Sequence, residues 1–233
     1  MLDNDALRRS AVVANCAMNR ERHLTGPNSY TRELGFNPLD RLTASVKTVG
    51  TAETVAAWLD LCCGTGRALV QAADQLRQAG RAEQVALVGV DLVDTFQPTP
   101  APDPPLRLIC ADLTTWTPDR RFDLITCVHG LHYLGDKLAL LRRAAGWLTD
   151  DGLFVADLDL ASIRLPDGRP AGRSLSTALR QAGFGYDPRR HRISCSGHRT
   201  VALPYTYLGA DDRAGPNYTN QPAVNAYYRR HSP

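Results

Sequence analysis

The sequence predicts an α/β fold with a doubly wound, mostly parallel sheet that is covered by helices on both faces. Short apolar stretches alternate with helical ones between residues 55 and 159, as they do in chains that build a parallel sheet. The first apolar stretch runs into a glycine turn that opens a helix, and acidic residues follow several of the strands. With 233 residues the chain has the length of one such domain with appendages, so we expect a single domain.

The composition is that of a globular protein, with 43% hydrophobic and 22% charged residues. No stretch approaches the roughly 18 apolar residues of a membrane span, and charged residues interrupt the N-terminus where a signal peptide would be apolar. We therefore expect a cytoplasmic protein without a membrane partner. The formal charge of +3 is too small to indicate a nucleic-acid partner, although residues 189–192 form a local basic run.

The six cysteines show no CxxC pair and no metal-ligand spacing. We interpret them as buried, reduced thiols that serve as small apolar residues, and we predict no metal site. Whether the chain acts alone or as a homodimer stays open at this stage.

Residues 1–50 precede the first strand of the sheet, and we predict that they form a helical cap over one end of it, distinct from residues 51–233. Apolar residues at helical spacing predict a first helix over 3–22, with Asp3 or Asn4 as its cap. A Gly-Pro-Asn turn at 26–28 follows. A second helix is predicted over 38–49, with Pro38 in its first turn.

Five strands with their helices follow in order. The strands are predicted at about 55–61, 85–90, 106–111, 122–128 and 152–157, and the helices at 68–79, closed by Gly80, and at 136–148. Five prolines between 95 and 105 exclude a full helix between the second and third strands. Beyond Asp159 we predict a helix at 174–182 and an antiparallel hairpin of 192–196 with 200–208. The last 25 residues carry too many aromatics for a disordered tail.

Ligands of such sheets bind outside the carboxyl ends of the strands, where Asp60, Asp91 and Asp112 follow the first three strands. Gly64 and Gly66 let the turn between the first strand and its helix bring backbone N–H groups close to a ligand. A carboxylate beside this turn disfavours a bare phosphate and indicates a ligand that also carries a cation. Asp91 can accept hydrogen bonds from both hydroxyls of a ribose.

The segment Asp60-Leu61-Cys62-Cys63-Gly64-Thr65-Gly66 closely resembles the first motif of class I S-adenosylmethionine-dependent methyltransferases. Cys62 stands where that family more often has glycine. The chain is also similar to the small-molecule members of the family at residues 122–125, 131–134 and 148–152. Residues 28–36 resemble a segment of actinobacterial methyltransferases of specialised metabolism.

This resemblance implies a seven-stranded Rossmann-like methyltransferase fold with a terminal antiparallel hairpin, and S-adenosylmethionine as the cofactor. Asp60 would receive the ammonium group, Asp91 the ribose and Asp112 the adenine amino group. We further expect the N-terminal cap to close as a lid over the methionine carboxylate. The predicted cofactor site consists of Tyr30, Arg32, Asp60, Cys62, Cys63, Gly64, Thr65, Gly66, Asp91, Leu92, Asp112, Leu113 and Val128.

The methyl acceptor is expected between the loop after the fourth strand and the C-terminal tail. His132 or His129 is predicted to take the acceptor's proton, with His132 favoured because it falls on the family's Leu-His segment. Aromatic residues would line this side of the pocket and suit an aromatic or cationic acceptor, namely Tyr133, Tyr218, Tyr227 and Tyr228.

We predict transfer of a methyl group to an oxygen or nitrogen of a small molecule, a specialised metabolite. The Asn/Asp-Pro-Pro-Tyr segment of enzymes that methylate planar nitrogens is missing, which disfavours nucleobases and glutamine side chains as substrates. The alternatives are an RNA methyltransferase that uses residues 189–192, and a non-catalytic cofactor-binding partner of another enzyme. A nicotinamide-binding domain is disfavoured because Leu69 stands where its third glycine belongs.

Overall fold

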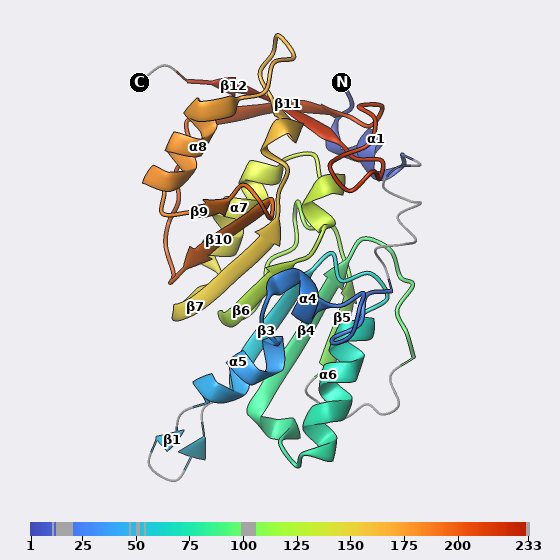
Figure 1. Cartoon of the computed structure of the whole chain (residues 1–233), viewed down its shortest axis with the longest axis vertical. Coiled ribbons are helices and arrows are strands. Elements are labelled where there is room, and N and C mark those ends of the chain that lie inside the picture. The colour runs from blue at the N-terminus through green and yellow to red at the C-terminus, as the bar shows by residue number, and fades with distance from the viewer. Residues whose placement is uncertain are drawn as a thin grey trace.

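The structure is a computed structural model that describes residues 1–10, 12, 21–46, 48–49, 52–53, 55–98 and 106–231. A seven-stranded sheet forms its centre (Figure 1). The strands of this sheet are β3 Ala56–Leu61, β4 Val85–Asp91, β5 Leu106–Cys110, β6 Phe122–Cys127, β7 Leu148–Asp157, β9 Gly185–Asp187 and β10 Arg192–Ser196.

The strand order is β5-β4-β3-β6-β7-β10-β9. The first five strands in this order run parallel, whereas β10 is antiparallel to both of its neighbours, β7 and β9. The chain builds outward from β3 to β5 and then returns to the other side of β3 with β6, so the order reverses between β3 and β6. Such a reversal leaves a crevice at the carboxyl ends of the strands, and the predicted fold class is confirmed.

Helices cover both faces of this sheet. On the face turned to the viewer in Figure 1 lie α5 Pro38–Ser45 and α6 Arg67–Gln78, while α7 Lys137–Gly146 and α8 Gly172–Gln181 pack on the opposite face. The side chains of β3 alternate accordingly, because Trp58 joins the core beneath α5 and α6 whereas Leu59 joins the core beneath α7. The short helices are α1 Asn4–Arg8, α4 Tyr30–Leu34, η1 Ala82–Gln84, η2 Gly130–Tyr133 and η3 Leu160–Ser162.

Two smaller sheets complete the fold. One has three strands in the order β11-β12-β8, formed by β11 Tyr205–Asp211, β12 Asn225–Arg230 and β8 Ile163–Arg164, and the other pairs β1 Thr48–Val49 with β2 Ala52–Glu53. The predicted hairpin of 192–196 with 200–208 is wrong. Since β10 already pairs with β7 on one edge and β9 on the other, it has no free edge for a third strand. The hairpin is β9 with β10, and β11 pairs with β12 instead.

Several element boundaries differ from the prediction. The helix predicted to reach residue 148 ends at Gly146, and β7 begins at Leu148 instead of residue 152. The helix predicted over 38–49 ends at Ser45. The first helix is capped by Asp3 as predicted, but α1 ends at Arg8, and most of residues 11–20 lie outside the described part of the chain.

The proline-rich connection is non-helical over residues 92–98, and residues 99–105 lie outside the described part. Of the described cysteines, Cys110 is exposed, against the prediction of a buried thiol, because β5 is the edge strand of the sheet. Within the described residues, no helix is both long and apolar enough to cross a membrane.

Candidate active site

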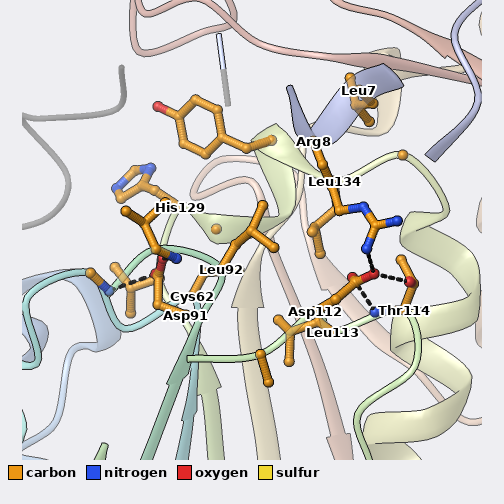
Figure 2. A pocket seen from close by; sticks show the side chains of 17 residues that line it. Leu7, Arg8, Cys62, Asp91, Leu92, Asp112, Leu113, Thr114, His129 and Leu134 are labelled. Atoms are coloured by element: carbon orange, nitrogen blue, oxygen red, sulfur yellow. Dashed lines mark hydrogen bonds and ion pairs between the residues drawn. The ribbon is translucent and has the colours of Figure 1, made fainter. Parts of the chain in front are cut away.

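A cavity opens at the carboxyl ends of β3, β4, β5 and β6 (Figure 2). It encloses about 810 Å³ of empty space, including its open mouth. Its walls come from four loops and from the N-terminal helix α1, and they consist of Leu7, Arg8, Cys62, Gly64, Asp91, Leu92, Val93, Ala111, Asp112, Leu113, Thr114, Val128, His129, Gly130, Tyr133, Leu134 and Gly135.

The glycine turn after β3 forms one wall of the cavity through left-handed backbone. Gly64 and Gly66 have φ angles of 62° and 73°, and Cys62 adopts 57° although it carries a side chain. The turn packs against the loop after β6 so closely that a Cβ at Gly130 would lie 2.4 Å from the Cβ of Cys62. Glycine is therefore required at 130 for the two loops to meet beside the cavity.

Two carboxylates project from neighbouring strands into this cavity. Asp91 ends β4, and its two oxygens accept hydrogen bonds from the N–H of Gly64 at 2.9 Å and of Val93 at 3.1 Å. Asp112 follows β5 and accepts from the N–H and the hydroxyl of Thr114, at 2.8 Å and 2.6 Å. Figure 2 also shows the guanidinium of Arg8, from α1, paired with Asp112. Backbone N–H groups thus hold Asp91 at the cavity wall, and a backbone N–H, a hydroxyl and a guanidinium hold Asp112.

Asp60 behaves differently, although it also stands near the end of its strand. It lies on the α5 side of β3 with only 1% of its surface exposed, and it does not line the cavity. The Tyr30 hydroxyl and the Thr126 hydroxyl each donate to one of its oxygens at 2.6 Å. Burial raises the pKa of Asp60 to about 7, against the opposing effect of these hydrogen bonds.

The predicted cofactor residues therefore fall into two groups. Those that line the cavity are Cys62, Gly64, Asp91, Leu92, Asp112, Leu113 and Val128. Those that do not are Tyr30, Arg32, Asp60, Cys63, Thr65 and Gly66. Arg32 is exposed and donates to the carbonyl of Pro27 at 3.2 Å, so in this conformation it does not face the cavity.

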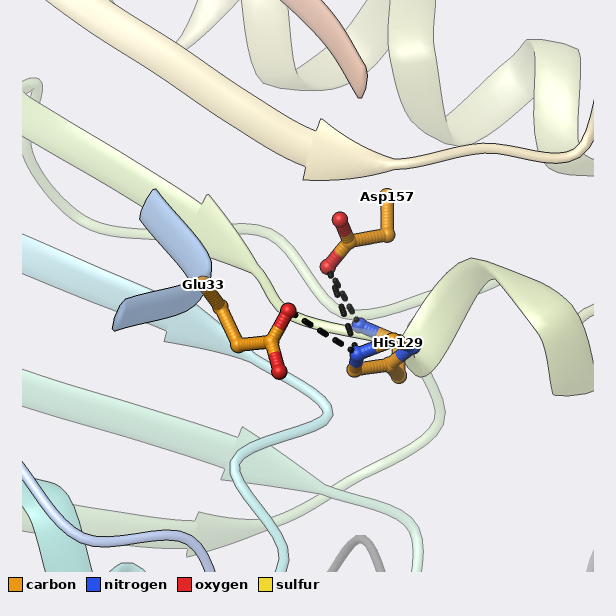
Figure 3. Close-up of side chains that lie close together, drawn as sticks. All are labelled: Glu33, His129 and Asp157. Atoms are coloured by element: carbon orange, nitrogen blue, oxygen red, sulfur yellow. Dashed lines mark hydrogen bonds and ion pairs between the residues drawn. The ribbon is translucent and has the colours of Figure 1, made fainter. Parts of the chain in front are cut away.

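Three ionisable side chains meet where β6 and β7 end (Figure 3). His129 follows β6 with a φ of 58°, and its Nε2 lies 3.5 Å from a Glu33 oxygen and 4.0 Å from an Asp157 oxygen. The backbone N–H of His129 donates to the same Asp157 oxygen at 3.1 Å. The imidazole of His129, together with the guanidinium of Arg22 at 2.6 Å, lowers the pKa of Glu33 to about 2.

His132, the favoured base of the sequence analysis, lies outside the cavity wall. Its side chain is buried, and within the described residues neither ring nitrogen has a hydrogen-bond partner. Burial, together with the positive charges nearby, lowers the pKa of His132 to about 3. In this conformation His129 lines the cavity and His132 does not, while the choice of base between them stays a prediction.

The four predicted substrate tyrosines are also divided. Tyr133 lines the cavity and donates to Gln221 at 3.2 Å. Tyr218 is 40% exposed and stacks on His191 at a ring separation of 3.9 Å. Tyr227 and Tyr228 lie on β12 and line no part of the cavity. Tyr228 is a core residue, because its hydroxyl accepts from Leu138 N–H and donates to Asp136 at the start of α7.

Sequence reasoning missed three important residues. Asp157 ends a strand, so the rule that selected Asp91 and Asp112 could have found it. Glu33 and Arg8 lie on short N-terminal helices, and only the folded chain brings them to the sheet.

The strand order, the glycine turn and the paired carboxylates define a class I methyltransferase fold. A family model described as a methyltransferase domain matches residues 36–193, which is more than half of the chain, so the chain belongs to this family. The resemblance to class I S-adenosylmethionine-dependent methyltransferases is thereby confirmed, and the resemblance of residues 28–36 to actinobacterial enzymes stays a prediction. A search of curated proteins finds no match.

Similar solved structures include the plantazolicin methyltransferase BpumL, with 16% identity and a TM-score of 0.38 over 58% of this chain and 46% of that one. CalS10 from Micromonospora echinaspora, an amino pentose methyltransferase, shows 19% identity and a TM-score of 0.40 over 64% and 56%. The N-methyltransferase NodS from Bradyrhizobium japonicum shows 15% identity and a TM-score of 0.47 over 82% of this chain and 100% of that one. The chain thus spans about half the length of the first two.

Proposed function

We propose that this protein transfers the methyl group of S-adenosylmethionine to an oxygen or nitrogen of a small molecule, a specialised metabolite. The observation that carries the proposal is the cavity beside the glycine turn, into which Asp91 and Asp112 project from adjacent strands. A carboxylate at each position suits the ribose hydroxyls and the adenine amino group, with Leu113 against the ring. When bound, S-adenosylmethionine supplies an activated methyl group on its sulfonium.

The residues around the cavity contribute mainly by positioning. Asp91, held by Gly64 and Val93, would fix the ribose, and the turn backbone would lie along the methionine moiety. Val128, Leu134 and Leu113 would exclude water from the reacting atoms. Holding two reactants in line can supply roughly 7 to 11 kcal/mol of the reduction in barrier.

The two remaining alternatives receive less support. The basic run at residues 189–192 is partly engaged, because Arg190 pairs with Asp187 at 3.5 Å and Arg192 donates to the Leu34 carbonyl at 2.7 Å. It therefore offers RNA less positive surface than its sequence suggests. A non-catalytic cofactor-binding role would leave the same cavity, and only turnover with an acceptor separates it from the enzyme.

Calorimetry with S-adenosylhomocysteine, and with NAD⁺ as the comparison ligand, tests the cofactor assignment. We expect micromolar affinity for S-adenosylhomocysteine and none for NAD⁺; the opposite result would overturn the proposal. Limited proteolysis with and without the ligand tests the lid. If residues 1–50 close over the cofactor, cleavage within them slows when it is bound, and equal cleavage in both states contradicts a lid.

A further inference from the structure

Three potential metal-ligand atoms from three separate elements surround one point beside the cavity. Glu33 comes from α4, His129 follows β6, and Asp157 ends β7 (Figure 3). One carboxylate oxygen of each acid and one imidazole nitrogen lie within 4.8 Å of one another. Of the three residues, only His129 lines the cavity, and it belongs to the loop after the fourth parallel strand, beside which the methyl acceptor is expected from the sequence.

The separations within this cluster suit a bound ion better than direct contacts. The distances of 3.5 Å and 4.0 Å from His129 Nε2 to the two carboxylates exceed the length of an N–H···O hydrogen bond. A point equidistant from three atoms spaced in this way lies roughly 2.1 to 2.4 Å from each, close to the bond lengths of divalent metals to nitrogen and oxygen.

Contacts outside the cluster, or with its backbone, hold both carboxylates beside this point. Arg22 pairs with the other oxygen of Glu33 at 2.6 Å. The backbone N–H of His129 holds the Asp157 carboxylate at 3.1 Å, and the His129 side chain is 8% exposed. Within the described residues, the Nδ1 of this buried ring has no hydrogen-bond partner. One nitrogen of this imidazole is therefore left without a partner in that part of the chain, and the other, Nε2, faces the two carboxylates.

We propose that Glu33, His129 and Asp157 bind one divalent metal ion beside the cavity, at the part of its wall that His129 forms. One nitrogen and two carboxylate oxygens suit ions such as Mn²⁺ and Zn²⁺. Arg22 beside Glu33 and Arg192 near Asp157 offset part of the negative charge, which favours an exchangeable ion over a permanent structural one.

This inference rests on the proposed function for its chemical role. An ion at this point keeps coordination positions open for an acceptor oxygen, and a metal lowers the pKa of a hydroxyl that binds to it. The acceptor class would then be a molecule with a hydroxyl and a second donor atom nearby. Because Nε2 of His129 would bind the ion, this nitrogen could not also act as the general base predicted from the sequence.

The test uses the full chain after treatment with EDTA and dialysis. Mn²⁺ is titrated into the protein, and free Mn²⁺ is followed by electron paramagnetic resonance. We expect one bound Mn²⁺ per chain, with affinity reduced at least about tenfold in Glu33→Gln and in Asp157→Asn. Glu83→Gln removes the same charge from an exposed site on η1 and should leave the affinity unchanged.

Calorimetry with S-adenosylhomocysteine on the same samples shows that each variant is folded and keeps the two proposals separate. Should a variant fail to fold, electron spin-echo measurements on the wild-type Mn²⁺ complex replace it as the test. We expect modulation from one imidazole nitrogen, because His129 is the only histidine of the cluster. Absence of Mn²⁺ binding while S-adenosylhomocysteine binds overturns the metal site alone. The metal site is also overturned if both variants bind Mn²⁺ as strongly as the wild type does, or if the wild-type complex shows no nitrogen signal.

Discussion

The carboxyl edge of the sheet has two halves that are built in different ways. Where β4 and β5 end, each carboxylate is held by nearby backbone: Asp91 by the turn after β3 and its own loop, and Asp112 by Thr114 two residues away. Where β6 and β7 end, the cluster depends on Glu33, which is about a hundred residues distant in sequence. In the first half, turns beside the strand ends orient both carboxylates, and the distant Arg8 adds an ion pair to Asp112. The second half has no such local support, because its cluster forms only once α4 packs against the sheet.

The largest effect is expected in the first half. Asp91→Ala removes the predicted ribose acceptor and should weaken S-adenosylmethionine binding by about 1.5 to 3 kcal/mol, roughly 10- to 150-fold, as for a charged hydrogen-bond acceptor. Asp94→Ala, which removes an exposed carboxylate from the same loop, is the matched control. Calorimetry decides the matter, and unchanged affinity in a folded Asp91→Ala protein would place the ribose elsewhere.

Asp60 tests whether a strand-end carboxylate must face the ligand. Its pKa of about 7 means that, between about pH 4 and pH 7, the unfolded chain loses this proton while the folded chain keeps it. The free energy of unfolding therefore falls as the pH rises through this window and then levels off.

Asp60→Asn has no such proton, so its free energy of unfolding does not fall in this way. The difference in free energy of unfolding, variant minus wild type, should therefore increase by roughly 2 kcal/mol between pH 5 and pH 8. Urea denaturation at several pH values measures this difference. A difference that stays constant with pH would show that Asp60 is ionised throughout and is matched by a cation.

These two aspartates also show how far the sequence carries the site. Sequence periodicity and strand ends located the sheet, the glycine turn and the two carboxylates in the cavity. The sequence could not distinguish Asp60 from Asp91, because Tyr30 and Thr126, which bury Asp60, are 30 and 66 residues away from it in the chain. The misplaced hairpin has the same cause, since only the pairing of β10 with β7 and β9 leaves β11 to another sheet.

The sequence predicts that the two tyrosines of β12 line the acceptor pocket, and substitutions test whether they contribute to stability instead. Tyr228→Phe removes the hydroxyl that joins β12 to the start of α7, so the free energy of unfolding should fall by about 1 kcal/mol while cofactor affinity stays unchanged. Tyr227→Phe, the neighbouring change on the same strand, should leave the free energy of unfolding unaltered. Thermal and urea unfolding measure both. If Tyr228→Phe instead loses turnover without losing stability, the prediction that Tyr228 lines the acceptor pocket is supported.

The smallest effect concerns Arg8, which joins the N-terminal helix to the first half of the site. Its guanidinium pairs with Asp112, the carboxylate expected to accept from the adenine amino group. Arg8 and the cofactor therefore compete for one acceptor. Because the Arg8 side chain is 38% exposed, the ion pair is screened and weak.

Arg8→Ala should accordingly strengthen S-adenosylhomocysteine binding, by about two- to threefold, and reduce its dependence on salt. Arg9→Ala is the control, since Arg9 caps the same helix without lining the cavity. If Arg8→Ala weakens binding instead, the guanidinium helps to hold the cofactor, and α1 belongs to the lid that closes over it. Calorimetry at low and high salt separates the two outcomes, because a contact that Arg8 makes to the ligand loses strength in salt whereas a competing ion pair does the reverse.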